Sequence, residues 1–396
     1  MSGDNATQKT RILGIVEEHM QVLIDLSAFL HDNPEIAFEE YKASESITDI
    51  MHREGFTIER GIGDLDTAFK ASSSYGTGRP VIAVLAEYDA LPEIGHACGH
   101  NLIAAMSVGA AIAANLALRD SGHDGTIILM GTPAEERGGG KGILVSKGCF
   151  DGIDCAMMVH PSSHTRAEDS SLASTRVILR YTGKGAHAAA APWSGANALE
   201  AAIQTFNLIN AWRCQLRGLS RINGIITKGG TAVNIIPEHA EAQFGIRAAD
   251  RGYLEELVEK VHNCAESAAA GMGVTIEFER VGRGYDALRN NPVLKNLIAS
   301  NFTLVGEEVV VMPRGAGMSS TDMGNVTQAL PGLHCYIKVK GDIQPHTPAF
   351  AAACVGESAA RAIAAGAKAL GMTAMDLFSE PRLVEEARSA FDRKDP

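Results

Sequence analysis

The sequence predicts an α/β protein in which a mostly parallel sheet is flanked by helices and carries an inserted α+β domain. Short apolar runs at residues 81–86, 126–130 and 155–159 have the length and β-branched content of strands covered on both faces. An apolar helical stretch at residues 102–118 separates the first two runs, as in a β-α-β unit. After about residue 172 the order changes to β-α-β-β-α-β, which is the ferredoxin-like order.

The other elements of the first domain follow from hydrophobic periodicity. Residues 10–30 carry apolar side chains at helical spacing, and Asn33-Pro34 ends that pattern. From about residue 290 the chain returns to helix, followed by a strand over His334–Val339 and an alanine-rich helix over Ala349–Leu370. We therefore expect both ends of the chain to build one domain, from residues 1–172 and 288–396.

The inserted domain is expected over residues 173–287. Its alternating patterns predict four strands and two helices, in the chain order strand 177–181, helix 196–216, strand 224–227, strand 240–248, helix 253–270 and strand 274–279. The domain would separate the two halves of the first domain along the chain.

Composition narrows the class of protein. The 396 residues are 45% hydrophobic and 21% charged, which is typical of a globular chain and excludes a disordered one. The net charge of −12 argues against nucleic acid and anionic membranes as partners and favours a small molecule. The first ten residues are polar and no apolar run reaches the roughly 20 residues of a membrane span, so we expect a cytoplasmic protein. Seven cysteines without a framework pattern are expected to be mostly small buried hydrophobic residues, with Cys98 set apart by its neighbours.

Polar side chains follow each of the three apolar runs. The first run ends in Glu87-Tyr88-Asp89, the second leads to Glu135-Glu136, and the third ends in His160. Between the first two lies the turn His96-Ala-Cys98-Gly-His100, which opens into the apolar helix. Because ligands bind at the carboxyl ends of parallel strands, these groups are expected to meet at one sheet edge.

The side chains of Cys98, His100, Glu136 and His160 are the ligand types of zinc or a neighbouring transition ion. Taken singly, each has a simpler interpretation. A Cys-x-His pair is a weak signal, a histidine after a strand is usually a hydrogen-bonded structural residue, and adjacent glutamates are usually solvated. Only their joint placement at one sheet edge favours a metal site.

Adjacent glutamates at a strand end can divide the chemistry between them. Consecutive extended residues point in opposite directions, so we expect one glutamate to bind metal while its neighbour takes a proton from a water. His346, between Pro345 and Pro348, would by itself be a loop histidine, but it brings the number of ligands to that needed for two ions.

Together these residues resemble a known family. The motifs are Asn33-Pro-Glu35 with Glu39-Glu40, Ala86-Glu-Tyr-Asp-Ala-Leu-Pro92, His96-Ala-Cys-Gly-His-Asn101, Pro133-Ala-Glu-Glu136, Gly183-Lys-Gly-Ala-His187 and Pro345-His-Thr347. They are similar to those of the metallopeptidase family of aminoacylases, carboxypeptidase G and succinyl-diaminopimelate desuccinylase. The match is to its amidohydrolase branch, with aminobenzoyl-glutamate hydrolase, indoleacetyl-amino-acid hydrolases and a β-alanyl-lysine-type dipeptidase. It runs in order from about residue 31 to 350.

The resemblance implies a zinc-peptidase-like fold with a ferredoxin-like lid that dimerises, and two divalent ions per subunit, zinc or manganese, with cobalt also compatible. It assigns Cys98 as the bridge between the ions, His100 and His160 to one ion, and Glu136 and His346 to the other. Glu135 would be the general base, and Asp89 would orient a ligand. Many relatives have His-x-Asp where this chain has Glu87-Tyr-Asp89, which leaves open whether Glu87, or the nearby His96, contacts the metal site.

In the lid, the resemblance implies that His187 reaches into the partner subunit's site and stabilises the oxyanion. Asn234 and Arg247 correspond to groups that hold the substrate carboxylate, although an ion pair within the lid is an equal alternative for Arg247. The stretch Gly317-Met-Ser-Ser-Thr-Asp322 corresponds to a loop lining the specificity pocket, so Ser320 and Thr321 are candidate substrate contacts.

The function expected on these grounds is hydrolysis of the amide between an acyl or aminoacyl group and an amino acid by a homodimer. Substrates would be N-acyl-amino acids, aminobenzoyl-glutamate-like compounds or dipeptides. One alternative is hydrolysis of a non-peptide C–N bond, in an aryl amine or ureido substrate, by the same dinuclear site. A second is a metal- or ligand-binding homologue without turnover.

Overall fold

The computed structural model describes residues 3–311 and 319–393, which form two compact units. The sheet unit comprises residues 3–170, 288–311 and 321–393, and the lid unit comprises residues 171–287 with 319–320. The sequence placed all of 288–396 in the first domain, whereas Ser319 and Ser320 belong to the lid unit. They do so because Leu172 donates its N–H to the Ser319 carbonyl (3.1 Å) and accepts from the Ser320 hydroxyl (2.8 Å).

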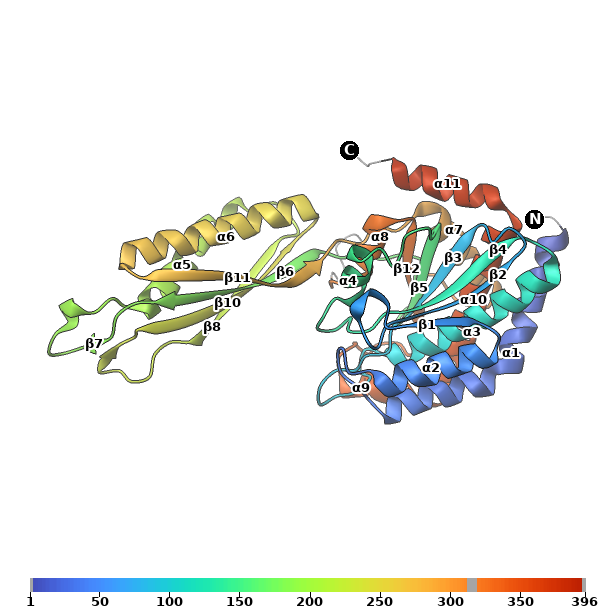
Figure 1. The fold of residues 1–396 in the computed structure, drawn as a ribbon, viewed down its shortest axis with the longest axis horizontal. Helices are drawn as coiled ribbons and strands as arrows, with labels where there is room; N and C mark the ends of the chain where they lie inside the picture. The colour runs from blue at the N-terminus through green and yellow to red at the C-terminus, as the bar shows by residue number, and fades with distance from the viewer. Residues whose placement is uncertain (1–2, 312–318, 394–396) are drawn as a thin grey trace. The chain divides into compact units, whose positions relative to one another are not determined.

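The sheet unit is built on a six-stranded sheet of order β1-β2-β4-β3-β5-β12 (Figure 1). Four strands are parallel, namely β4 (Gly125–Gly131), β3 (Val81–Ala86), β5 (Cys155–Ser162) and β12 (Gly332–Lys338). This confirms the predicted mostly parallel sheet. The antiparallel edge of β1 (Thr57–Arg60) and β2 (Phe69–Tyr75) was not predicted, because the serines of β2 hide its apolar pattern.

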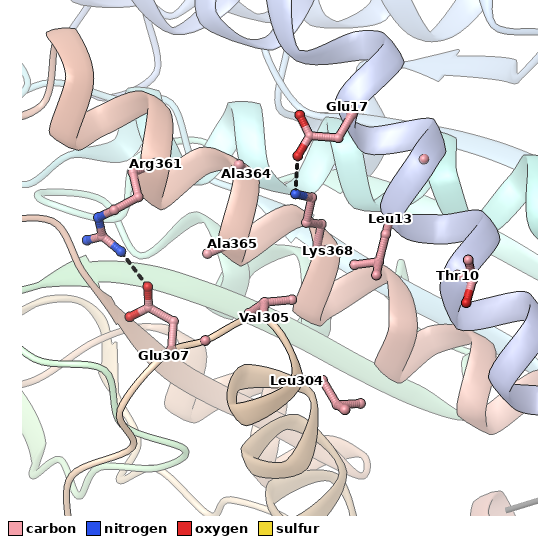
Figure 2. A pocket seen from close by; sticks show the side chains of 12 residues that line it. Thr10, Leu13, Glu17, Leu304, Val305, Glu307, Arg361, Ala364, Ala365 and Lys368 are labelled. Atoms are coloured by element: carbon pink, nitrogen blue, oxygen red, sulfur yellow. Dashed lines mark hydrogen bonds and ion pairs between the residues drawn. The ribbon is translucent and has the colours of Figure 1, made fainter.

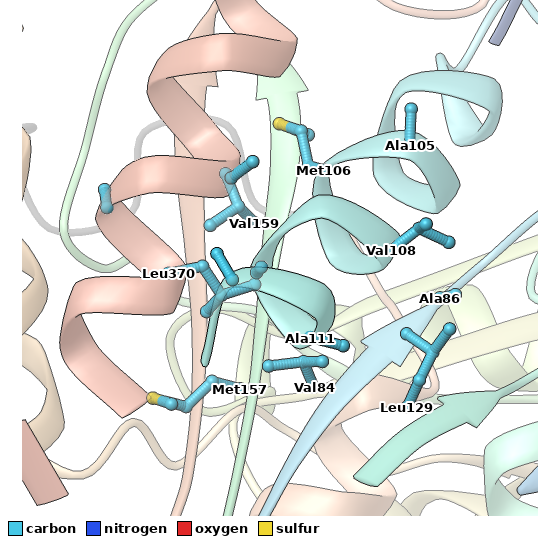
Figure 3. Packing of buried hydrophobic residues seen from close by; sticks show 14 of the residues in the cluster. Val84, Ala86, Ala105, Met106, Val108, Ala111, Leu129, Met157, Val159 and Leu370 are labelled. Carbon is cyan, nitrogen blue, oxygen red and sulfur yellow. The ribbon is translucent and has the colours of Figure 1, made fainter. Parts of the chain in front are cut away.

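Each parallel strand is covered on both faces, which explains its continuous apolar run. On one face Val84, Leu129 and Met157 pack in the same cluster as residues of α1 (Gly3–Asp32), α3 (His100–Ser121) and α10 (Gly356–Ser379) (Figure 3). On the other face Ala83 and Ile128 pack with residues of α4 (Gly140–Ser146) and α8 (Met323–Ala329). Successive strand residues point to opposite faces, so one strand contributes to both cores.

The helices differ in places from the predicted ones. The expected helix over 349–370 is two helices, α9 (Pro348–Ala353) and α10, because the chain bends at Gly356, whose φ is 77°. The remaining helices of the unit are α2 (Tyr41–Arg53), α7 (Pro292–Leu304) and α11 (Pro381–Asp392). Among the described residues, α3 is the one helix with the length and apolar content of a membrane span, and 94% of its most apolar window is buried inside the protein.

The lid unit has the predicted β-α-β-β-α-β order. Its elements are β6 (Ala173–Thr182), α5 (Ala198–Trp212), β8 (Arg221–Lys228), β10 (His239–Ala248), α6 (Arg251–Met272) and β11 (Thr275–Tyr285). The strands pair antiparallel in the order β11-β6-β10-β8, which places β8 and β11 at the edges. A separate short ladder pairs β7 (Ala186–His187) with β9 (Ile235–Ile236). Val177, Phe244 and Leu254 are among the fully buried residues of the lid core.

Candidate active site

The predicted polar groups do lie at one edge of the parallel sheet. β3 and β4 run in register so that Ala86 pairs with Gly131, and the Thr132 N–H continues the ladder to the Ala86 carbonyl (2.8 Å). The segments that follow these strands therefore leave the sheet side by side. They carry Glu87 and Asp89 on one segment and Glu135 and Glu136 on the other, so the strand register brings these carboxylates together.

Three groups of side chains that include an imidazole present ligand atoms within 4.8 Å of one another at this edge. These groups are Cys98 with His100 and His160, Cys98 with Glu136 and His346, and His100 with Glu135 and Glu136. Cys98, His100 and Glu136 each belong to two of them, so the three groups form one continuous cluster. The structure thus brings together all five residues that the sequence named as metal ligands, and Glu135 with them.

Local backbone geometry produces this convergence. Gly99 has a φ of 80°, and a Cβ there would lie 2.5 Å from the Pro161 side chain, so the turn between Cys98 and His100 requires glycine. His346 has a φ of 64° and donates its N–H to the Ala97 carbonyl (2.8 Å). That bond ties the loop of His346 to the Cys98 turn.

Hydrogen bonds orient the imidazoles. His100 is fully buried and its Nδ1 lies 2.9 Å from the Asp89 carboxylate, so Nε2 is the atom directed to the cluster. The other Asp89 oxygen accepts the Glu136 N–H (2.9 Å). His160 donates Nδ1–H to the Pro161 carbonyl (2.7 Å), which leaves its Nε2 3.5 Å from the Cys98 sulfur.

Among the described residues, two buried ligand atoms of the cluster make no hydrogen bond of good geometry, His100 Nε2 and Glu136 Oε1. Each has an ion-pair contact instead, His100 Nε2 with Glu87 and Glu136 Oε1 with His346, both at 3.3 Å. Because buried polar atoms normally make well-aligned hydrogen bonds, a bound cation would satisfy these two better. They lie 3.9 Å apart beside a thiol and further imidazoles. A convergent set of buried sulfur, nitrogen and oxygen donors fits divalent zinc or manganese.

Burial sets the protonation of the cluster. It raises the pKa of the Cys98 thiol and lowers that of His160 to about 4. It also lowers the pKa of His96 to about 3, and His96 belongs to none of the three groups. The contact with the Glu136 carboxylate, 3.3 Å from Nε2, raises the pKa of His346. A bound cation would reverse the first of these effects, because it favours the thiolate.

The sequence expectation about the two glutamates was wrong in one respect. They do not extend the strand, because β4 ends at Gly131 and Ala134 has a φ of 62°. The carboxylates of Glu135 and Glu136 therefore converge within 4.8 Å instead of pointing in opposite directions. Glu135 is 8% exposed, and burial together with the charges of Glu87 and Asp322 raises its pKa.

Sequence reasoning missed Lys141. It is fully buried, and its ammonium contacts Glu87 (2.6 Å) and Asp322 (2.7 Å). These two carboxylates and that of Glu135 also lie within 4.8 Å of one another, but here a lysine already supplies the positive charge. The second oxygen of Glu87 lies 3.3 Å from His100 Nε2. A lysine in the glycine-rich run 138–142 is typical of an exposed turn, so the sequence offered no local sign of its burial.

His334 lies on the strand predicted over His334–Val339, and its ring packs edge-on against that of His160, with the ring centroids 5.6 Å apart. The Tyr336 hydroxyl lies 3.2 Å from its Nδ1. The parallel pairing of β12 with β5 matches Tyr336 with His160, so the tertiary structure, not the local pattern, places these rings beside the site.

The predicted lid residues form two groups at opposite ends of the lid sheet. Arg247 pairs with Ser174 near the start of β6 and contacts the Ser320 hydroxyl. His187 follows the end of β6 and lies in the ladder with β9, where the Asn234 carbonyl accepts the Ala188 N–H (3.0 Å). Within a single lid, Arg247 and Asn234 therefore lie towards opposite ends of the lid sheet, whose strand β6 runs eight residue steps, or about 26 Å, from Ser174 to Thr182.

The last candidates lie in the predicted specificity loop. Thr321 belongs to the sheet unit, is 6% exposed, and accepts the Met323 N–H through its hydroxyl (3.2 Å). Residues 317 and 318 of the same loop lie outside the described residues.

A cavity of about 740 Å³ opens elsewhere in the sheet unit, between α1, α10 and the end of α7 (Figure 2). Its charged side chains are paired with each other, Glu17 with Lys368 and Glu307 with Arg361. None of its lining residues belongs to the donor groups, so its size does not make it the site of the chemistry.

A parallel α/β sheet whose carboxyl edge gathers thiol, imidazole and carboxylate donors beside a further buried carboxylate defines a metal-dependent hydrolase. The sequence profile of Peptidase family M20/M25/M40 matches residues 83–374. The chain belongs to that family and is a metallopeptidase or amidohydrolase that cleaves amide bonds.

Named relatives agree with this assignment. The chain is 36% identical to the Xaa-Arg dipeptidase of Mus musculus, over 98% of this chain and 92% of that protein. It is 33% identical to a p-aminobenzoyl-glutamate hydrolase chain of Escherichia coli, over 68% of this chain and 60% of that protein. In fold it resembles a dinuclear metal binding peptidase of Bacillus subtilis from the M20 family, with a TM-score of 0.70 at 22% identity, over 92% of this chain and 99% of that one.

Proposed function

We propose that this chain hydrolyses the amide bond between an acyl or aminoacyl group and an amino acid, with Glu135 as the general base. The observation that carries the proposal is the convergence of Glu135 with His100 and Glu136 beside the Cys98 groups. The relatives named for Xaa-Arg dipeptides and for aminobenzoyl-glutamate support substrates that release a free amino acid.

Cys98, His100, His160, Glu136 and His346 would hold two divalent ions, which supply a polarised carbonyl and a more acidic water when bound. Asp89 accepts from His100 Nδ1 and from the Glu136 N–H, so it orients both side chains. Glu135 takes one proton from the attacking water at a carboxylate oxygen. The water oxygen bonds to the carbonyl carbon, the C–N bond breaks, and Glu135 returns the proton to the leaving amine nitrogen.

Glu135→Gln tests the base, because glutamine is isosteric but cannot take the proton. We expect kcat to fall at least about a hundredfold with the metal content of the purified protein unchanged. The substrates assayed should include dipeptides that end in arginine or lysine, aminobenzoyl-glutamate and N-acyl-amino acids. Near-normal turnover of Glu135→Gln on any of them would overturn the mechanism.

Arg247 is proposed to bind the substrate carboxylate, since a guanidinium suits a bidentate contact with it. Arg247→Ala should raise KM for acyl-amino acids and leave the weaker cleavage of the corresponding amino acid amides unchanged. An equal loss on both substrates would instead favour a role within the lid.

We further propose a homodimer in which His187 acts in the partner subunit's site. His187 is exposed, and its Nδ1 accepts the N–H groups of Ala189 and Ala190, so the neutral ring carries its proton on Nε2. That N–H is suited to donate to an oxyanion. The separation of His187 from Arg247 along one lid supports two different subunits as their sources.

Subunit mixing tests this arrangement. His187→Ala and Glu135→Gln should each be inactive alone, whereas a re-associated mixture should recover about a quarter of wild-type activity, because one site of each hybrid dimer is then complete. A mixture that stays inactive although hybrids form would overturn the proposal.

The cytoplasmic location stays a prediction.

A further inference from the structure

We propose that Glu40 is a positioning residue that fixes the backbone from which Glu135 projects. The inference rests on the proposed role of Glu135. It explains a motif that the reaction itself leaves unused, Glu39-Glu40 in the segment that follows α1.

Glu40 is fully buried, and both of its oxygens are used. One accepts the N–H groups of Ala134 (2.9 Å) and Phe38 (3.0 Å). The other accepts the hydroxyl of Thr67 (2.8 Å). The carboxylate thereby connects the segment after α1 to the residue that directly precedes Glu135.

The residue that Glu40 holds is in an unfavourable conformation. Ala134 has a φ of 62°, in the left-handed region that alanine rarely adopts, and such a conformation persists only where its surroundings impose it. The Ala134 carbonyl is also held, because it accepts the N–H groups of Gly138 and Gly139. A turn that brings Glu135 back toward His100 therefore depends on bonds to Ala134.

Glu135 is flanked by two such anchors. On its N-terminal side Glu40 binds the Ala134 N–H, and on its C-terminal side Asp89 binds the Glu136 N–H. The two carboxylates come from different parts of the chain, which fixes the direction of the Glu135 side chain from both sides. Asp89 also binds His100, whereas the hydrogen bonds of Glu40 go to Phe38, Thr67 and Ala134, so its effect can be separated from metal binding.

Neighbouring contacts place Glu40 on the same loop. Phe38 has a φ of 66°, and its ring lies where a Cβ on Gly138 would come within 2.3 Å of it. Burial first, and then the charge of Asp89, raises the pKa of Glu40 to about 7. The bonds to Phe38 and Ala134 need only an acceptor oxygen, so a neutral glutamine can replace the carboxylate at this position.

The test compares Glu40→Ala with Glu40→Gln. We expect kcat of Glu40→Ala to fall about 10- to 100-fold, with KM and metal content close to wild type, because misplacing a reacting group slows the chemical step. Glu40→Gln keeps the bond to Ala134 and should restore kcat to within about threefold of wild type. Thr67→Val is the matched control: it removes the other bond of the same carboxylate and should lower the melting temperature without lowering kcat.

A second variant separates positioning from stability. Ala134→Gly in the Glu40→Ala background should raise the melting temperature, because glycine accepts positive φ, yet leave kcat low, because the flexible turn no longer directs Glu135. If kcat recovers together with the melting temperature, Glu40 is only structural and the proposal is overturned. If Glu40→Ala does not fold, Glu40→Asp, which withdraws the acceptor by one methylene, takes its place in both comparisons.

Glu135→Gln, assayed alongside, keeps the two proposals distinguishable. If Glu135→Gln retains turnover, the proposed function fails. If Glu135→Gln is inactive and Glu40→Ala has wild-type kcat, only the positioning role of Glu40 fails.

Discussion

Glu87 shows how a single residue takes its role from its neighbours. Sequence left open whether it contacts metal, and the structure pairs it with Lys141, which also holds Asp322. Burial alone would favour a neutral lysine, but the two carboxylates outweigh it and raise the pKa of Lys141. The Lys141 ammonium therefore compensates the charge of two fully buried carboxylates that lie close to Glu135.

Lys141→Met should destabilise the protein by about 3–5 kcal/mol, because it leaves two fully buried carboxylates without their cation. The thermal midpoint of unfolding of Lys141→Met should be compared with that of Lys147→Met. Lys147 pairs with Asp64 at a similar distance (2.6 Å), but both side chains are largely exposed, so its loss should change little. Equal effects of the two substitutions would contradict the role of Lys141.

Glu40 gives the stability a pH dependence. Its pKa is about 7 in the folded protein and near 4.5 when unfolded, so the folded state binds the proton more tightly. Stability relative to Glu40→Gln should therefore fall by about 3 kcal/mol as the pH rises from 4.5 to 7, and then stay constant. Thermal midpoints of the two proteins at about pH 5 and pH 8 measure this. A difference between the two proteins that does not change with pH would refute it.

At the scale of elements, the start of α4 packs against the loop that carries Glu135. A Cβ on Gly140 would lie 2.0 Å from the Pro133 carbonyl oxygen, a backbone atom that can move only with the loop. Gly142, two residues further along the same helix, has space, since the atoms nearest to its Cβ would be those of the Asn325 side chain, at 3.4 Å or more. The start of α4 is therefore in close contact with the loop, and only glycine fits at position 140 without displacing the loop.

Gly140→Ala should lower kcat at least about tenfold, because the loop must shift to admit the methyl group. Gly142→Ala should keep kcat and stabilise the helix by up to about 1 kcal/mol, as alanine is the better helix former. Steady-state kinetics and thermal midpoints of both variants check this pair. Normal kcat in Gly140→Ala would show that the loop tolerates displacement.

At the scale of the whole molecule, the proposed homodimer needs a surface, and the lid unit offers β8. This strand is at a sheet edge, where unpaired backbone groups can pair with another chain. Ile225 and Ile226 on β8 are 62% and 41% exposed, although isoleucine is among the residues most often fully buried. The edge and its apolar side chains together favour association through β8.

We expect sedimentation or light scattering to give the mass of two chains, and Ile225→Glu to shift the protein to monomers. Thr275→Glu, on the opposite edge strand β11, is the control and should remain dimeric. If Thr275→Glu dissociates the protein and Ile225→Glu does not, the interface lies at the other edge.

The sequence alone determined the parallel strands and the main cluster of candidate metal ligands, because both follow from local periodicity. Continuous apolar runs predicted the parallel strands, and the groups that follow them predicted Cys98, His100, Glu136 and His160 as one cluster. The rule that parallel strands end at the same edge makes this possible without knowing any contact. The sequence could not show that Glu135 and Glu136 converge, since that follows from one backbone angle at Ala134.

Only the tertiary structure decided the roles of Glu40, Lys141 and the two ends of the lid. Glu40 meets Ala134 across 94 residues and Lys141 meets Asp322 across 181, and no local pattern records such pairings. Likewise, strand register places Arg247 and Asn234 at opposite ends of the lid sheet. Periodicity determines which residues form an element and which face is buried, whereas long-range packing determines which buried charges compensate one another.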